Sequence, residues 1–365
     1  MERSLTIPGG IQPHAGRSPW IHGPAWDMGW LIGSAAIVPV VLFFVWRGNS
    51  SEAINLGVTA LIGGPHLFAT YTATFLDPRF RRSHLWLLLA SALLVPAFVA
   101  YWTLVNFQIL LSVFIFAASV HVLHQNAYLT DIYRKRAGHP EPLWSRLTDY
   151  GLLMISIYPI AAYKLVHSNF LLGDVQILIP SFLMVPFTYW AVWVVFAVFL
   201  SAWIRKTATE YRQGRLNGPK TLLIGVTTAI VFFVPLSASG ERLELAFQSV
   251  NAWHSIQYLG LVWYIQKVRK ERGLIDSRLV AGICGGGRAA WYFYGFCLLV
   301  TLALFGLLVG GASLDPLHLT FQQYYYMGVL SCLLIHYVLD GYLFTISNRA
   351  GAQPEQIPFA VLSAA

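Results

Sequence analysis

The stretch LLSVFIFAASVHVLHQNAYLTDIYRKR, residues 110–136, joins an apolar run to two histidines and a basic end. An apolar helix of about 20 residues is long enough to cross a hydrocarbon core of about 30 Å. A cluster such as RKR is typical of the cytoplasmic end of a membrane-spanning helix. Ionisable side chains inside a bilayer are costly and usually functional, so His121 and His124 indicate a site within the membrane.

The whole chain has the composition of an integral membrane protein. Mean hydropathy is +0.59, 56% of the residues are hydrophobic and only 11% are charged, whereas soluble domains carry roughly a quarter charged residues. We therefore predict an all-α fold, a polytopic membrane helix bundle of about ten transmembrane helices in one domain, residues 27–346. The predicted helices cover residues 27–46, 53–76, 85–105, 107–132, 149–167, 180–204, 221–238, 243–266, 289–311 and 321–346. Residues 1–26 and 347–365 are predicted to be tails.

The basic residues test this count of helices. With the N-terminus in the cytoplasm, all 24 basic residues except Arg47, Lys164 and Arg242 fall in cytoplasmic segments, as the positive-inside rule requires. We expect both tails to be cytoplasmic and the protein to lie in a cell (inner or plasma) membrane. The net charge of +8 then follows from topology, and no basic module indicates nucleic-acid binding. The three cysteines have neither metal-binding nor disulfide spacing.

Four histidines inside predicted helices share one depth, because each lies thirteen residues before the next Lys or Arg. The pairs are His66 and Arg79, His121 and Arg134, His254 and Lys267, and His336 and Arg349. At 1.5 Å per residue, each histidine is roughly 20 Å from that basic residue. The second, fourth, eighth and tenth helices carry these histidines and all run toward the cytoplasm, so the four imidazoles are predicted to lie on one layer near the bilayer centre.

A shared layer favours a metal site. A single membrane histidine often serves as a hydrogen-bonding partner between helices. Four at one depth are harder to explain in that way, because an unpaired imidazole is costly to desolvate and helix packing needs no common plane. Imidazoles suit iron, copper or zinc, whereas magnesium and calcium prefer oxygen ligands. We predict non-haem iron, with copper or haem as alternatives, and the metal ligands are His66, His121, His254 and His336.

Four further polar side chains accompany the proposed ligands: His124, Gln125, Gln257 and Asp340. His124 and Gln125 share a helix face with His121, and Asp340 shares one with His336. We predict that the four residues orient the ligands or handle protons at the catalytic centre. His124 is alternatively a fifth ligand or part of a second metal site. Asp340 is alternatively a ligand or a group at the inner interface.

The run GGP, residues 63–65, directly precedes His66. Proline removes a backbone donor, and glycine allows close backbone approach, so a break in the helix is expected here. Such a break serves either a cavity beside His66 or helix packing alone.

Iron or copper with four histidine ligands keeps coordination positions open for dioxygen. In a chain without a soluble domain, this predicts an oxygenase, surrounded by membrane lipids, that acts on a lipophilic substrate arriving from the bilayer. An electron donor would be a further partner if the reaction needs one. The sequence has no Gly-x-Ser-x-Gly elbow, so nucleophilic hydrolysis has no support.

The arrangement of these four histidines on separate membrane helices resembles that of the Brp/Blh-type carotenoid dioxygenases. The resemblance implies a non-haem iron and cleavage of a carotenoid, or another lipid, by dioxygen. It is a resemblance of arrangement, since this chain lacks two histidines four residues apart on one helix and has two more predicted helices than that family.

Two other classes of function stay open. A haem-binding electron-transfer protein would use the histidines as axial ligands, although stacked haems need histidine pairs at two depths and this chain offers one layer. A proton or metal transporter would use His and Asp as a relay, and it predicts a polar track to both faces of the membrane.

Overall fold

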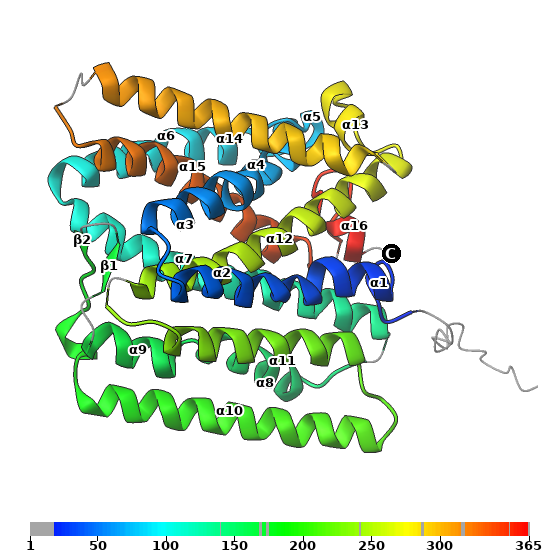
Figure 1. Cartoon of the computed structure of the whole chain (residues 1–365). Coiled ribbons are helices and arrows are strands. Elements are labelled where there is room, and N and C mark those ends of the chain that lie inside the picture. Colours follow the sequence, from blue (N-terminus) through cyan, green and yellow to red (C-terminus); the bar gives the residue numbers. More distant parts are fainter. Residues whose placement is uncertain are drawn as a thin grey trace, which may run out of the picture.

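The computed structural model describes residues 18–138, 140–167, 170–172, 175–240, 242–285, 288–314, 318–349 and 351–363. These residues form a helix bundle whose long members run roughly along one direction (Figure 1). A short antiparallel hairpin of β1 (Leu171–Leu172) and β2 (Val175–Gln176) lies at one end. The predicted all-α fold is confirmed.

Among the described residues, eight helices are long and apolar enough to cross a membrane. They are Pro24–Trp46, Ser51–Ala73, Leu85–Val105, Phe107–Ala137, Pro186–Arg212, Gly218–Leu236, Ala290–Leu314 and Phe321–Ile346. Two of the ten predicted spans are outside this set. α12 (Arg242–Glu271) is 30 residues long but carries many polar side chains, and the predicted span 149–167 is divided between α8 (Leu143–Ile155) and α9 (Tyr158–His167).

Three of the eight spans are composite, and the third of them, Gly218–Leu236, joins α11 (Gly218–Phe233) to η5 (Val234–Leu236). The first joins α1 (Pro24–Trp26), η1 (Asp27–Ile32), η2 (Gly33–Ala36) and α2 (Ile37–Trp46), and the second joins α3 (Ser51–Val58), η3 (Thr59–Gly63) and α4 (Gly64–Ala73). The other elements are α5 (Pro78–Ser83), α6 (Leu85–Val105), α7 (Phe107–Ala137), η4 (Ser181–Leu183), α10 (Pro186–Arg212), α13 (Arg278–Ile283), α14 (Ala289–Leu314), α15 (Phe321–Ile346) and α16 (Ala360–Ser363). α1, α5, α13 and α16 lie at one end of the bundle (Figure 1), which we call the inner end.

The predicted break before His66 is present as the π-helical turn η3 followed by α4. Pro65 has no N–H to give to the carbonyl of Leu61 four residues earlier, and that carbonyl accepts a hydrogen bond from the hydroxyl of Tyr294 at 2.8 Å. Gly64 packs closely on α14, where an added Cβ would meet a threonine methyl group at 2.2 Å. The break therefore allows two helices to approach and fixes the position of His66.

The segment after α15 belongs to the core. Ile357, Phe359 and Leu362 are buried in the main hydrophobic cluster, and the hydroxyl of Tyr128 donates to the carbonyl of Phe359 at 3.1 Å. Residues 347–365, predicted as a tail, thus include a stretch that packs into the inner end of the bundle.

Several basic residues of the inner end are buried in ion pairs instead of facing water. Asp149 on α8 pairs with Arg134 of α7 at 3.0 Å and with Lys206 of α10, and it lies 3.5 Å from Lys220 of α11. Glu141 pairs with Arg134 and Lys220. A buried charge is tolerated only when it is paired, so this network holds four helices in one arrangement.

Candidate metal centre

Four histidine rings meet inside the bundle. They come from α4, α7, α12 and α15 and are His66, His121, His254 and His336, all buried. The ring centre of His66 is 4.5 Å from that of His336 and 4.8 Å from that of His254. The ring centre of His121 is 4.9 Å and 5.0 Å from the same two rings, and it lies across the group from His66 at 6.3 Å. The four histidines that were predicted to share one depth therefore form a single cluster.

The rings keep several nitrogen atoms unpaired. Among the described residues, no hydrogen bond is made by Nε2 of His66, His121 and His336, by either ring nitrogen of His254, or by Oδ2 of Asp340. Potential ligand atoms of His66, His121 and His254 lie within 4.8 Å of one another, and so do those of His121, His336 and Asp340. Each unpaired buried polar atom costs about 1–3 kcal/mol, so this cluster is unfavourable unless something binds to it.

A chain of hydrogen bonds sets the tautomer of His336. Its Nδ1 lies 2.7 Å from Oγ1 of Thr70, and Thr70 donates its one hydroxyl proton to Oδ1 of Asp340 at 2.9 Å. Thr70 therefore accepts a proton from Nδ1 of His336, and Nε2 retains a free lone pair. A lone pair of this kind is what a metal ligand requires.

Asp340 uses its two oxygens differently. Oδ1 accepts hydrogen bonds from Thr70 and from the hydroxyl of Tyr258, the latter at 2.6 Å. Oδ2 lies 3.6 Å from Nε2 of His336 and 4.0 Å from Nε2 of His121. Oδ1 thus accepts the hydrogen bonds, and Oδ2 points toward the two histidine rings. This position fits a metal ligand better than a residue that only orients a ligand.

Each of the four helices that contribute a ring to the centre carries a polar side chain one turn nearer the inner end. Thr70, Gln125, Tyr258 and Asp340 each follow a histidine by four residues, a spacing that places both on one helix face. The hydroxyls of Thr70 and Tyr258 both donate to Oδ1 of Asp340, and their oxygens lie 2.6 Å apart. Thr70 and Tyr258 are absent from the sequence-based set, and the repeated four-residue spacing is the signal that would have found them.

His66 and His121 also contact neighbouring aromatic side chains. The ring of His66 lies edge-on to that of Tyr258, with ring centres 4.9 Å apart and planes inclined by 89°. The ring of His121 stacks on Tyr337, with ring centres 4.1 Å apart and planes inclined by 20°. These contacts limit rotation of both rings.

Gln125 and Gln257 lie beside the centre and bind each other. Nε2 of Gln125 donates to Oε1 of Gln257 at 2.6 Å and to the backbone carbonyl of His254 at 3.3 Å. Gln257 donates to the carbonyl of Leu31 in the π-helical η1. The pair therefore links α7, α12 and η1 and supports the backbone that carries His254.

His124 lies apart from the four rings. It is half-buried, and its ring edge packs against Phe344 with centres 5.4 Å apart. It belongs to neither group of potential ligands in the described part of the chain. Its role as an orienting group stays a prediction.

A cavity of about 840 Å³ adjoins the centre, and His66 and His254 line it. Its other lining residues on α7, α12 and α15 mostly precede the histidines of those helices, so it extends away from the inner end. The wall is mainly apolar and aromatic and includes Phe114, Phe247 and Tyr337. This size is typical of small-molecule sites.

The inner side of the centre is packed with rings. The ring of Tyr258 lies 6.3 Å from that of Phe344 and 6.4 Å from that of Phe359, and Tyr128 stacks on Phe344 at 4.8 Å. The centre therefore borders a cavity on one side and closely packed aromatic rings on the other.

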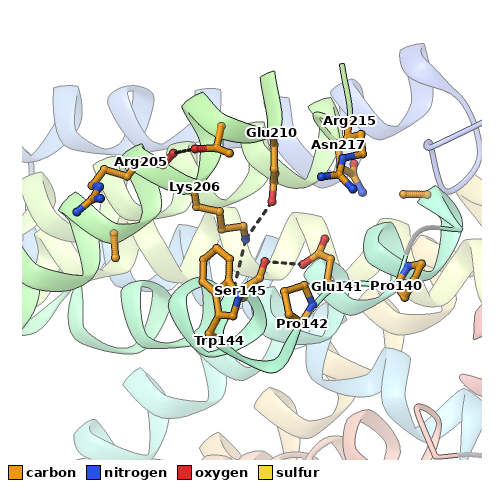
Figure 2. A pocket seen from close by; sticks show the side chains of 13 residues that line it. Pro140, Glu141, Pro142, Trp144, Ser145, Arg205, Lys206, Glu210, Arg215 and Asn217 are labelled. Carbon is orange, nitrogen blue, oxygen red and sulfur yellow. Dashed lines mark hydrogen bonds and ion pairs between the residues drawn. The ribbon is translucent and has the colours of Figure 1, made fainter. Parts of the chain in front are cut away.

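A second pocket, of about 420 Å³, lies between α8 and α10 at the inner end (Figure 2). Lys206 reaches toward the carbonyl of Ser145 at 3.3 Å and toward Glu210 at 3.8 Å, and the Ser145 hydroxyl donates to Glu141 at 3.1 Å. These groups satisfy one another, so the pocket belongs to the ion-pair network and not to the histidine centre.

Comparison of the chain with family models, with curated proteins and with solved structures finds no match.

Proposed function

We propose that this protein is an integral membrane metalloenzyme, a non-haem iron or copper oxygenase that acts on a lipophilic substrate. The proposed ligands are His66, His121, His254 and His336, with Asp340 as a fifth. The observation that carries the proposal is the set of unpaired, buried nitrogen and oxygen atoms on these five side chains. The two groups of potential ligand atoms share His121, so an ion bound there could engage members of both, with one nitrogen from each ring.

The donor set favours a redox metal. Imidazole with one carboxylate suits iron and copper. A zinc ion would be structural in a closed four-ligand site, whereas this helix bundle already has packed hydrophobic clusters. When bound, iron or copper would supply activation of dioxygen.

The ring positions disfavour haem. Two axial histidines need the plane between them free for a macrocycle. The rings of His66 and His121 lie across from each other at 6.3 Å, but the rings of His254 and His336 stand between them, each about equally near to both. A porphyrin has no room there.

The protein's own residues would orient the metal ligands and bind the substrate. Thr70 fixes the tautomer of His336, and Tyr258 holds Oδ1 of Asp340, so both ligands are set before a metal arrives. Tyr258 also offers a hydroxyl proton beside the centre. The apolar wall of the cavity would hold the substrate near His66 and His254 and exclude water.

We further propose ten membrane crossings, with both ends of the chain in the cytoplasm of a cell membrane. α12 and the α8–α9 pair, added to the eight apolar spans, make ten. Both run from one end of the bundle toward the other (Figure 1). The positions of the basic residues support this orientation. The four histidines would then lie near the bilayer centre.

A transporter is the alternative, and polar residues in the outer half of the bundle favour it. Asn251 donates to Gln248 at 3.0 Å along α12, and both line the cavity. Transport also requires a path to the inner face. The packed rings of Tyr128, Phe344 and Phe359 occupy that side, which supports a centre reached from one direction only.

Dioxygen uptake tests the proposal. Protein in lipid nanodiscs, loaded with ferrous or cuprous ion, would be offered apolar lipids from the host membrane in an oxygen electrode. We expect lipid-dependent uptake that is lost in His336→Ala and retained in Thr103→Val, which removes a buried hydroxyl bonded only to its own helix. Metal-loaded protein that consumes no dioxygen with these lipids, but moves metal ions or protons into vesicles, would overturn it.

A further inference from the structure

The cavity has a polar end far from the metal centre. Its lining includes Glu52 and Asn55 at the start of α3 and Glu244 and Gln248 at the start of α12. His254 lies ten residues after Glu244 on the same helix, which corresponds to about 15 Å. The cavity therefore joins a polar end and a metal end across a mainly apolar wall.

The polar side chains at that end are bound to one another in a definite order. Nδ2 of Asn251 donates to Oε1 of Gln248 at 3.0 Å, Nε2 of Gln248 donates to Oδ1 of Asn55 at 3.1 Å, and Nδ2 of Asn55 donates to Oε1 of Glu244 at 3.3 Å. The chain of donors ends on a carboxylate. Glu244 is buried, and a carboxylate within a membrane is costly, so it needs donors or positive charge around it.

The charge of this end selects the kind of head group. Glu52 and Glu244 give it negative charge, and the nearby Arg242 does not line the cavity but donates to the carbonyl of Val45 at 2.9 Å. A carboxylate has about four acceptor positions, so Glu244 can accept from a ligand and from protein donors such as Asn55 at the same time. An alcohol or an amine is favoured, and a carboxylate or phosphate head group is repelled.

Part of the cavity lining is exposed on the outside of the bundle. Leu56 and Phe321 both line the cavity, and each is 54% exposed on the outside of the bundle. Because these two side chains border both the cavity and the outer surface, a membrane lipid would enter between α3 and α15 without crossing water.

From these observations, we propose that the ligand of the cavity is a single-chain amphiphile with a hydrogen-bond-donating head group, an alcohol or an amine. The head group binds at Asn55, Glu244 and Gln248, and the chain extends toward His66 and His254, so that a position about 15 Å from the head group meets the metal. The identity of this ligand as a substrate rests on the proposed oxygenase function. Its binding does not.

The test compares probes of one chain length: hexadecanol, hexadecylamine, hexadecane and palmitate. Binding to the full protein in nanodiscs would be measured from the shift in thermal unfolding temperature, and metal content would be measured on the same samples. We expect hexadecanol and hexadecylamine to bind at least about tenfold more tightly than hexadecane or palmitate.

The variants assign that preference to the polar end. Glu244→Leu should abolish it while metal content stays at the wild-type level, and Asn55→Ala should weaken it if Glu244→Leu fails to fold. Ser119→Ala is the matched control, since Ser119 lines the cavity but donates only to the carbonyl of Phe116 in its own helix. Equal binding of alcohol and hydrocarbon, or an unchanged preference in Glu244→Leu, would overturn the inference and leave the metal centre standing. Selective alcohol binding by a protein that never holds a metal would overturn the proposed function and leave this site standing.

Discussion

Thr70 joins His336 to Asp340: its Oγ1 lies 2.7 Å from Nδ1 of the histidine and donates to Oδ1 of the carboxylate at 2.9 Å. One hydroxyl therefore controls both a ring tautomer and the orientation of an acid. Partners of this kind typically change metal affinity by 10–100-fold when they are removed.

Thr70→Val keeps the shape of the side chain and deletes this hydroxyl. We expect metal affinity to fall by about 10–100-fold, because His336 loses the acceptor that fixes its tautomer. Metal titration of the purified protein measures the effect. Thr103→Val, which deletes a buried hydroxyl elsewhere, should leave the affinity unchanged, and equal affinities in both variants would contradict the role of Thr70.

Gly64→Ala should disturb the centre through packing. The new Cβ would lie 2.2 Å from Cγ2 of Thr301, so α4 and α14 must separate, at a cost of about 1–3 kcal/mol. The displacement should also lower metal affinity, because His66 is two residues away. Gly57→Ala on the same span has nothing within 4 Å of its Cβ and should be neutral or slightly stabilising. Thermal unfolding in detergent compares the two, and equal stability would refute the close contact.

Phe359→Ala should destabilise the bundle although it lies in the last few residues of the chain. Phe359 is fully buried against Tyr128, Tyr258 and Phe344, and loss of such a ring costs about 3–5 kcal/mol. Denaturant unfolding in mild detergent measures this cost. A cost below that of the exposed change Leu314→Ala would show that the C-terminal segment is not part of the core.

Glu141 gives the fold a dependence on pH. Burial raises its pKa, but the hydrogen bonds and charges of Lys220 and Arg134 outweigh burial and lower the pKa from 4.5 to about 2. A carboxyl group whose pKa is lower in the folded state stabilises the fold above its unfolded pKa, and this stabilisation is lost as the pH falls through the folded pKa. We therefore expect Glu141 to lose its contribution as the pH falls from 4.5 toward 2.

The matched comparison is Glu141→Gln. At neutral pH this variant should be less stable than the wild type by roughly 2 kcal/mol, and the difference should vanish at the acid end of the range. Glu271→Gln, which changes an exposed residue, should differ little from the wild type at any pH. A difference between Glu141→Gln and the wild type that is constant with pH would contradict the assignment.

The sequence predicts the height of the four histidines because helical rise converts a shared thirteen-residue spacing into a shared depth. It does not predict their lateral positions. Those depend on which helices are neighbours, and on local breaks such as the one at Pro65. Asp340 was predicted with its role open, and the structure places one of its oxygens toward the rings of His121 and His336.

Other features of the structure could not be predicted from the sequence, for physical reasons. The cavity is a space between segments from Glu52 to Tyr337, and no local pattern encodes a space. Lys206 and Lys220 were expected at the cytoplasmic boundary, but both are buried against Asp149, because an acid far away in sequence pairs with them. The break between α8 and α9 falls within an apolar run that hydropathy alone joins into one span.

Metal content is the measurement that tests the central claim most directly. The wild-type protein and the four single variants His66→Ala, His121→Ala, His254→Ala and His336→Ala would be purified in mild detergent and analysed for elements, with absorption spectra and circular dichroism on the same samples. We expect about one iron or copper per chain and no Soret band in the wild type, and helical but metal-depleted variants. A Soret band, a metal-free wild type, or full metal content in all four variants would contradict the account.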